Sequence, residues 1–170
     1  MICPNCNYDN LPGSEVCERC QQDLTLLDVP VAHDRVQRSL MEDTVSILRP
    51  HTPVAVLPGA SVREAIQTML ARNIGSVLVI NEGGKLVGIL SERDLLTKVA
   101  GRVGPSEYRP VSEFMTRNPE TVVPADTLAF ALGKMDGGGY RHLPVLEDGK
   151  PVGVISVRDV LTHFTRMCNG

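Results

Sequence analysis

Four cysteines near the start of the sequence stand in two pairs with the same spacing. Two residues separate Cys3 from Cys6 and Cys17 from Cys20, and ten residues separate the pairs. Each Cys-x-x-Cys pair can present two thiolates to one ion, and four thiolates complete the tetrahedral set that zinc prefers. Such a set leaves no open position for a reactive water. The spacing therefore predicts a structural zinc site.

The cysteine segment is too short to fold on a hydrophobic core alone. Its sequence, CPNCNYDNLPGSEVCERC, resembles the short zinc ribbons at the ends of many prokaryotic proteins. Two alternatives stay open: iron in a site of rubredoxin type, or disulfide bonds. Residues 1–23 carry Arg19 against four carboxylates, the wrong sign for phosphate contacts. We therefore expect a folded cap or a protein-docking module, and no nucleic-acid partner.

A second pattern, Gly-x-x-Ser-x-x-Asp, occurs twice, where a predicted strand ends and a helix begins. A serine at the N-cap of a helix leaves its hydroxyl and the free backbone N–H groups pointing outward, and these groups favour a phosphate. A carboxylate can accept hydrogen bonds from two ribose hydroxyls, an arginine adds positive charge, and a glycine permits close approach to a flat base. The candidate binding residues are Gly88, Ser91, Arg93, Asp94, Gly153, Ser156, Arg158 and Asp159. The alternative is that serine and aspartate only cap the helix.

These motifs belong to an internal repeat. Residues from Pro53 to Val79 recur 66 positions later, and after Gly83-Gly84 the offset becomes 65. Each copy predicts the order strand, helix, strand, strand, helix, with Ser61 or Asp126 capping the first helix. We therefore expect an α+β fold in which two copies are related by a pseudo-twofold axis. The predicted strands are 54–57, 76–80 and 86–90 in the first copy, and 121–123, 142–146 and 152–155 in the second.

Four segments follow from these patterns. We assign residues 1–23 to the ribbon, 24–50 to a connector, 51–104 to the first repeat and 105–170 to the second. Apolar residues at helical spacing predict an amphipathic helix over 34–47 of the connector. The sequence leaves open whether this helix packs on the repeats or mediates self-association.

Residues 43–165 resemble a pair of CBS domains, the module named after cystathionine β-synthase. The resemblance rests on the two Gly-x-x-Ser-x-x-Asp motifs, the Arg-His-Leu-Pro-Val run at 141–145 and the repeat. It implies a disk of two packed repeats with two clefts that bind AMP, ADP, ATP or S-adenosylmethionine. It also implies that Asp94 and Asp159 hold ribose and that Ser91 and Ser156 lie near phosphate. Adenine would be held by Val54, Val56, Thr121 and Val122.

The two copies differ at the expected phosphate position. The second has Arg141-His142 where the first has Gly75-Ser76. Basic side chains there would face the phosphates, so we expect unequal sites. His142 could change charge near neutral pH, or it could be a hydrogen-bonded structural histidine. The run 137–139 of three glycines predicts a mobile loop or a close approach of the backbone to a ligand.

These features favour a regulatory protein that binds an adenine nucleotide and acts on a partner protein or its own oligomer, for which we expect a homodimer. No phosphate loop, nucleophile elbow or histidine metal motif occurs, so no enzyme is predicted. The net charge of −3 and the absence of a signal peptide or long apolar run predict a cytoplasmic chain. Three alternatives stay open: a zinc-ribbon transcriptional or RNA-associated regulator, an iron electron-transfer protein, and a scaffold without ligand.

Overall fold

The computed structural model describes the chain except residues 12, 26–33, 101–105 and 169–170. The chain divides into two compact units, Met1–Asp34 and Arg35–Gly170. Each is described by itself. Part of the predicted connector, residues 26–33, lies outside the described residues.

The first unit is built on two similar turns. Backbone bridges join Ile2 to Asp9 and Val16 to Asp23, so each cysteine pair lies at the start of its own antiparallel turn. The fully buried residues are Cys3, Cys17 and Leu24. Leu24 therefore packs in the ribbon core, although the sequence analysis placed it in the connector.

The first repeat follows the predicted order. It contains β1 (Ala55–Val56), α2 (Val62–Arg72), β2 (Ser76–Ile80) and β3 (Leu86–Ser91). Strand β1 is parallel to β2, and β2 is antiparallel to β3. The final helix differs from a regular one: α3 (Glu92–Asp94) passes directly into a π-helical turn, η2 (Leu95–Val99).

The second repeat contains α4 (Leu128–Gly138), β5 (His142–Glu147), β6 (Lys150–Ser156) and α5 (Val157–Cys168). The strand predicted at 121–123 is reduced to one parallel bridge between Val122 and Val145. Helix α4 is capped by the Thr127 hydroxyl, which accepts from the Phe130 N–H. The prediction that Asp126 caps this helix was wrong, because its carboxylate turns back and accepts from the Val123 N–H.

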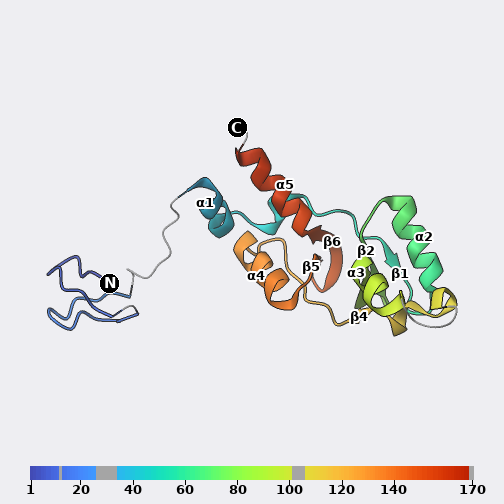
Figure 1. Ribbon diagram of the computed structural model, residues 1–170, viewed down its shortest axis with the longest axis horizontal. Helices are drawn as coiled ribbons and strands as arrows, with labels where there is room; N and C mark the ends of the chain where they lie inside the picture. The colour runs from blue at the N-terminus through green and yellow to red at the C-terminus, as the bar shows by residue number, and fades with distance from the viewer. Residues whose placement is uncertain (12, 26–33, 101–105, 169–170) are drawn as a thin grey trace. The chain divides into compact units, whose positions relative to one another are not determined.

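The predicted connector helix is shorter than expected. Helix α1 spans Arg35–Glu42, and a 3-10 turn, η1 (Val45–Leu48), follows after a break. Figure 1 shows α1 beside α4 and α5, and Val45 is fully buried in the core of the second repeat. The structure therefore answers the question left open by the sequence: α1 packs on the second repeat.

Each repeat contributes a short extended segment that pairs with the sheet of the other repeat. After two 3-10 turns, η3 (Ser106–Tyr108) and η4 (Val111–Glu113), strand β4 (Thr116–Arg117) pairs with β3 of the first repeat. His51, which precedes β1 of the first repeat, pairs with Val154 of β6 through two hydrogen bonds of 3.0 Å. Thr116 pairs with Ile89, and His51 pairs with Val154, which stands 65 positions after Ile89. The two crossings are therefore equivalent, as the predicted pseudo-twofold relation requires.

Each repeat has its own hydrophobic core. The first core gathers α2, β2, β3 and η4, with Val62, Val79, Leu90 and Phe114 fully buried. The second gathers η1, α4, β5 and β6, with Leu143, Val145 and Ile155 fully buried. No helix in the described part of the chain is long and apolar enough to cross a bilayer.

Candidate functional site: two serine–aspartate corners and a cleft

The first corner lies where β3 ends and α3 begins. Ser91 has an extended backbone and caps the helix, and its hydroxyl accepts from the Asp94 N–H. One Asp94 carboxylate oxygen, Oδ2, accepts in return from the Ser91 N–H over 2.9 Å and from the Ser91 hydroxyl over 2.6 Å. Serine and aspartate thus satisfy the free N–H groups of the helix start. The capping role predicted as the alternative to binding is present here.

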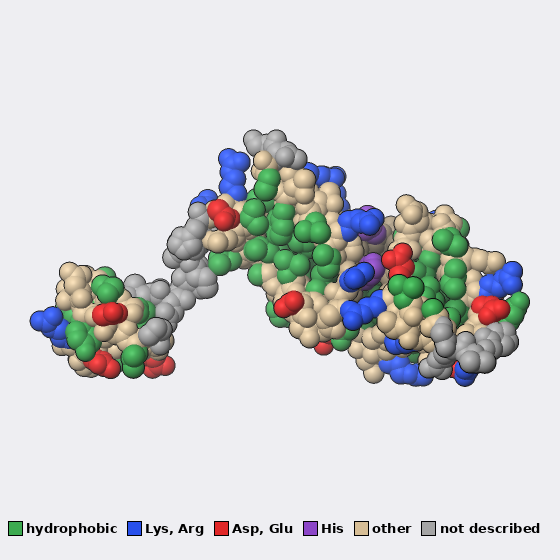
Figure 2. Space-filling model, in the orientation of Figure 1, with side chains coloured by type: hydrophobic (Ala, Val, Ile, Leu, Met, Phe, Trp, Pro, Cys, Tyr) green, Lys and Arg blue, Asp and Glu red, His purple; other side chains and the backbone are tan. Residues whose placement is uncertain are grey.

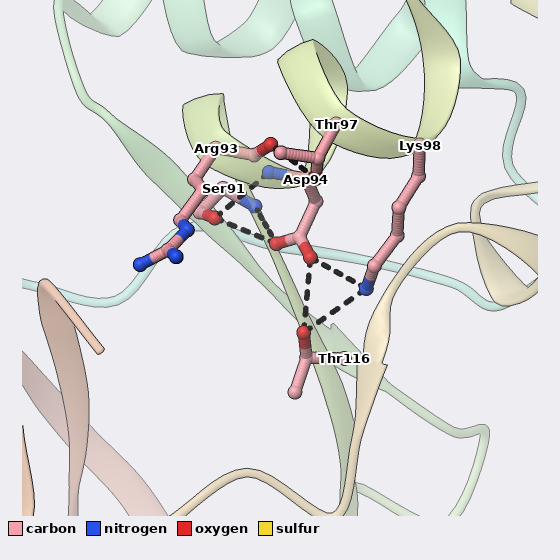
Figure 3. Close-up of polar contacts among 6 residues, drawn as sticks. All are labelled: Ser91, Arg93, Asp94, Thr97, Lys98 and Thr116. Carbon is pink, nitrogen blue, oxygen red and sulfur yellow. Dashed lines mark hydrogen bonds and ion pairs between the residues drawn. The ribbon is translucent and has the colours of Figure 1, made fainter. Parts of the chain in front are cut away.

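The other Asp94 oxygen is also occupied (Figure 3). Oδ1 accepts from the Thr116 hydroxyl over 3.0 Å and pairs with the Lys98 ammonium at 2.6 Å. Asp94 is only 7% exposed. Burial acts to raise the pKa of Asp94, but hydrogen bonds from Lys98, Ser91 and Thr116 outweigh it and hold this pKa below its usual range. Asp94 is therefore a charged carboxylate held entirely by protein groups.

The second corner, between β6 and α5, repeats the first with different partners. Asp159 Oδ2 accepts from the Ser156 N–H and from the Ser156 hydroxyl, each over 2.7 Å. Oδ1 faces Nε2 of His51 at 3.0 Å. Burial acts to raise the pKa of Asp159, but bonds from Ser156 and His51 lower it below the usual value. The two corners thus share the hydrogen bonds from serine to aspartate but differ in the partner of Oδ1.

A cleft of about 240 Å³ opens beside the first corner and is shared by both repeats. The first repeat contributes the predicted Ser91, Arg93 and Asp94, and the second contributes the predicted Arg141 and His142. Figure 2 shows basic side chains and histidine gathered where the two repeats meet. The remaining lining residues are Ile89, Glu92, Thr97, Lys98, Thr116, Gly138, Gly139 and Tyr140.

His142 carries a buried nitrogen at this cleft. Its Nδ1 is buried and has no hydrogen-bond partner among the described residues. Burial lowers the pKa of His142, Glu92 and Asp159 act to raise it, and Arg141 lowers it further. His142 is thus a largely buried base with an unused ring nitrogen at the junction of the repeats.

The run of three glycines predicted as a mobile or approachable loop lies at the end of α4, and Gly138 and Gly139 line the cleft. Gly137 and Gly138 complete α4, and Gly139 ends it with a φ of +64°. A side chain at Gly138 would stand 1.9 Å from the Tyr140 ring, so the aromatic ring fills this space. The Gly139 carbonyl accepts from Nη1 of Arg93 over 2.7 Å, which ties the two repeats together across the cleft.

The motif glycines face protein atoms rather than open space. A Cβ at Gly88 would lie 2.3 Å from the sulfur of Met115, and one at Gly153 would lie 2.5 Å from Pro50. Met115 and Pro50 lead into the two reciprocal strand crossings described above. Close approach of the backbone is therefore required, as predicted, but by the crossing strand and not by a base.

The residues expected to hold adenine do not line this cleft. Val122 is buried in the second core, and both its N–H and its carbonyl are used in sheet hydrogen bonds. The Thr121 carbonyl accepts from the Lys134 ammonium. Val54 packs on the first core, and Val56 lines a different, wide hollow of about 930 Å³ with Leu57 and Glu64. Arg158 is exposed and is not among the residues lining the 240 Å³ cleft.

Sequence reasoning missed Lys98 and Thr116, which contact Asp94. Lys98 follows Asp94 by four residues, the spacing at which side chains meet on a helix, so a local signal for it existed. Thr116 comes from the crossing strand β4, and no local signal could have shown it.

The four predicted cysteine ligands do converge. Their sulfur atoms all lie within 4.8 Å of one another; Cys3 and Cys20 are 3.6 Å apart, as are Cys6 and Cys17. A tetrahedron with Zn–S bonds of about 2.3 Å has edges of about 3.8 Å. The backbone N–H of Gln22 lowers the pKa of the Cys20 thiol, and the Asn5 amide adds to this. Geometry and chemistry therefore fit a tetrahedral metal ion.

One further polar cluster resembles a hydrolase triad in its residue types only. Nε2 of His163 lies 3.0 Å from the Ser39 hydroxyl and 3.3 Å from the Asp43 carboxylate. A triad needs the carboxylate on the opposite ring nitrogen from the nucleophile. These contacts instead connect α5 to α1 and to Asp43, the residue that follows α1.

Comparisons with known proteins agree with this architecture. A CBS domain-containing protein of Arabidopsis thaliana is 38% identical over 121 residues, which are 71% of this chain and 22% of that protein. The chain thus spans about a fifth of this relative. A CBS-domain protein structure from Agrobacterium tumefaciens is 36% identical with a TM-score of 0.67, covering 71% of this chain and 98% of that one.

Two structural neighbours were solved with adenosine ligands. A CBS domain protein of Pyrobaculum aerophilum, solved with AMP, is 27% identical with a TM-score of 0.63, covering 72% of this chain and 98% of that one. The CBS domain pair of protein MJ0100, solved with 5′-methylthioadenosine and S-adenosyl-L-methionine, is 25% identical with a TM-score of 0.66, covering 73% and 97%. The family model "CBS domain" matches residues 45–101 and 111–166. This chain, with its paired repeats and reciprocal strand crossings, therefore belongs to the CBS domain family.

Proposed function

We propose that the protein is a regulatory sensor that binds an adenine nucleotide of the AMP, ADP or ATP class between its paired repeats. One observation carries the proposal: a single cleft brings Ser91, Arg93 and Asp94 of one repeat against Arg141 and His142 of the other. Basic groups at the start of a helix suit a phosphate. Because the lining comes from both repeats, a ligand there can favour one packing of the repeats over another.

Calorimetric titration of the full chain with AMP, ADP, ATP and S-adenosylmethionine tests this proposal. We expect binding of at least one nucleotide, and we expect Arg141→Met to weaken it. Arg63→Met is the matched control, because Arg63 lies on α2 and contacts Tyr108 instead of the cleft. Absence of binding by all four compounds would refute the sensor function.

We propose that the ribbon holds one structural zinc ion through Cys3, Cys6, Cys17 and Cys20. The convergence of the four sulfurs supports this. Zinc there would close the two turns and supply folding free energy rather than reactivity. The acidic surface of the ribbon favours docking to a protein partner over nucleic acid.

We also propose that the chain acts in the cytoplasm as a homodimer. Leu96 and Leu161 occupy equivalent positions in the two repeats, and both side chains are exposed. Large exposed apolar groups of this kind suit contact with a second copy. Sedimentation equilibrium with and without AMP measures the assembly; a monomer in both conditions would contradict the dimer.

A further inference from the structure

The two corner aspartates differ in how many hydrogen bonds they already accept. A carboxylate has room for about four. Asp94 accepts four: two from Ser91, one from Thr116 and one from Lys98. Asp159 accepts three from the described residues, two from Ser156 and one from His51. A ribose therefore meets a saturated carboxylate at Asp94 and an incompletely used one at Asp159.

The side chain that contacts Oδ1 at each corner also differs in how firmly it is held. The Lys98 side chain is 37% exposed, and its ammonium contacts both Asp94 at 2.6 Å and Thr116 at 3.2 Å (Figure 3). The His51 side chain is 71% exposed, and among the described residues its ring contacts Asp159. An exposed pair loses little free energy when water or a ligand hydroxyl replaces one partner. His51 is thus the easier of the two to displace.

The fold explains why only the first corner holds a lysine in this way. With the 65-residue offset, Lys98 corresponds to His163, which faces Ser39 and Asp43 instead of Asp159. By strand register Thr116 corresponds to His51, because the two pair with the equivalent residues Ile89 and Val154. The chain after Asp94 is a π-helical turn, whereas α5 continues as a regular helix; such turns often mark functional positions.

We infer that Lys98 is an internal competitor of ribose, so that Asp159 accepts an adenosine ligand first and Asp94 accepts one only when Lys98 is displaced. This inference rests on the proposed function. A displaced Lys98 leaves an ammonium beside Arg93 and Arg141, and a phosphate would satisfy it. The Asp94 corner should therefore select phosphorylated ligands, whereas the Asp159 corner should also take adenosine itself.

Titration of the full chain with adenosine, which has no phosphate, tests the inference. We expect the wild type to bind one adenosine per chain and Lys98→Met to bind two, with affinity at the new site raised at least tenfold. Asp159→Asn should abolish binding of adenosine to the wild-type chain. Lys98→Arg keeps the cation and should bind one, as should Lys85→Met, which removes an exposed lysine from the β2–β3 turn.

The possible outcomes distinguish failure of the Lys98 inference from failure of the proposed sensor function. If AMP binds the wild type but Lys98→Met leaves the stoichiometry and affinity for adenosine unchanged, Lys98 is no competitor and the inference alone fails. Adenosine binding that survives Asp159→Asn in the wild-type background overturns it equally. If no variant binds adenosine or AMP, the sensor function fails with it. Lys98→Gln, which keeps a neutral donor to Asp94, provides the same comparison should Lys98→Met not fold.

Discussion

A hydrogen bond between Arg93 and Gly139 joins the two repeats at the cleft. The guanidinium on α3 donates from Nη1 to the carbonyl at the end of α4 over 2.7 Å. The same guanidinium lines the cleft with Arg141 and His142. A phosphate that attracts Arg93 would therefore compete with the Gly139 carbonyl, and this competition would couple binding to the contact between the repeats.

Replacing Arg93 should discriminate phosphorylated from unphosphorylated ligands. We expect Arg93→Met to weaken AMP binding about tenfold, since a charge-assisted hydrogen bond contributes about 1.5–3 kcal/mol. Adenosine binding should change less than about twofold, because no charge-assisted bond of that size would be lost. Parallel calorimetric titrations measure both. Equal losses for AMP and adenosine would show that Arg93 acts on the fold and not on phosphate.

Ligand binding should also involve His142 as a proton acceptor. Burial keeps the pKa of His142 below its ordinary value of about 6.5, so the ring is neutral at pH 7. A phosphate nearby would stabilise the charged form and cause proton uptake. Calorimetry of AMP binding at pH 6.5 in buffers of different ionisation enthalpy measures this uptake. It should vanish in His142→Gln; uptake that persists in this variant must come from another group.

Asp94 should contribute to stability in a pH-dependent way. We expect Asp94→Asn to lower the free energy of unfolding by about 1–3 kcal/mol at pH 7, because buried charge-assisted bonds are lost. The pKa of Asp94 is lowered on folding. Its contribution is therefore complete above the unfolded value of about 3.9 and is lost as the pH falls through the folded value.

Urea denaturation of wild type and Asp94→Asn at pH 7 and pH 3 measures this contribution. The difference between the two chains should shrink at pH 3. Protonation of other groups affects both chains and cancels in the comparison. A difference that stays the same at both pH values would mean that the Asp94 charge contributes nothing.

Gly88 should be intolerant of a side chain because of the crossing strand. We expect Gly88→Ala to lower stability by about 1–3 kcal/mol, since its Cβ would overlap the Met115 sulfur. Gly133→Ala is the matched control on α4, where nothing lies within 4 Å. It should instead raise stability by about 0.5–1 kcal/mol through helix propensity. Thermal denaturation measures the stability of both variants. Equal changes in stability for Gly88→Ala and Gly133→Ala would contradict the packing explanation.

The metal content of the ribbon should depend on each cysteine of the cluster. We expect elemental analysis to find one zinc per wild-type chain and almost none in Cys17→Ser. Cys168→Ser should keep its zinc, because Cys168 is exposed and outside the cluster. Adenine-nucleotide binding should survive in Cys17→Ser, since the ribbon and the repeats are separate compact units. Visible absorbance with iron in the analysis would contradict the zinc assignment.

The sequence by itself determined the features that depend on near neighbours along the chain. The convergence of the cysteines, the repeat, the order of strands and helices in the first copy and both serine–aspartate corners were all predictable. Each involves residues a few positions apart, where spacing alone dictates which groups can meet. The capping bonds of Ser91 with Asp94, and of Ser156 with Asp159, are of this kind.

Only the tertiary structure decided which distant groups reach those corners. Thr116 contacts Asp94, and His51 contacts Asp159, because each comes early in one repeat and pairs with the sheet of the other. The same crossings explain Gly88 and Gly153, which the sequence suggested would approach a base. Contacts between residues that are far apart in sequence depend on strand register and on packing of the two cores. No local spacing encodes that information.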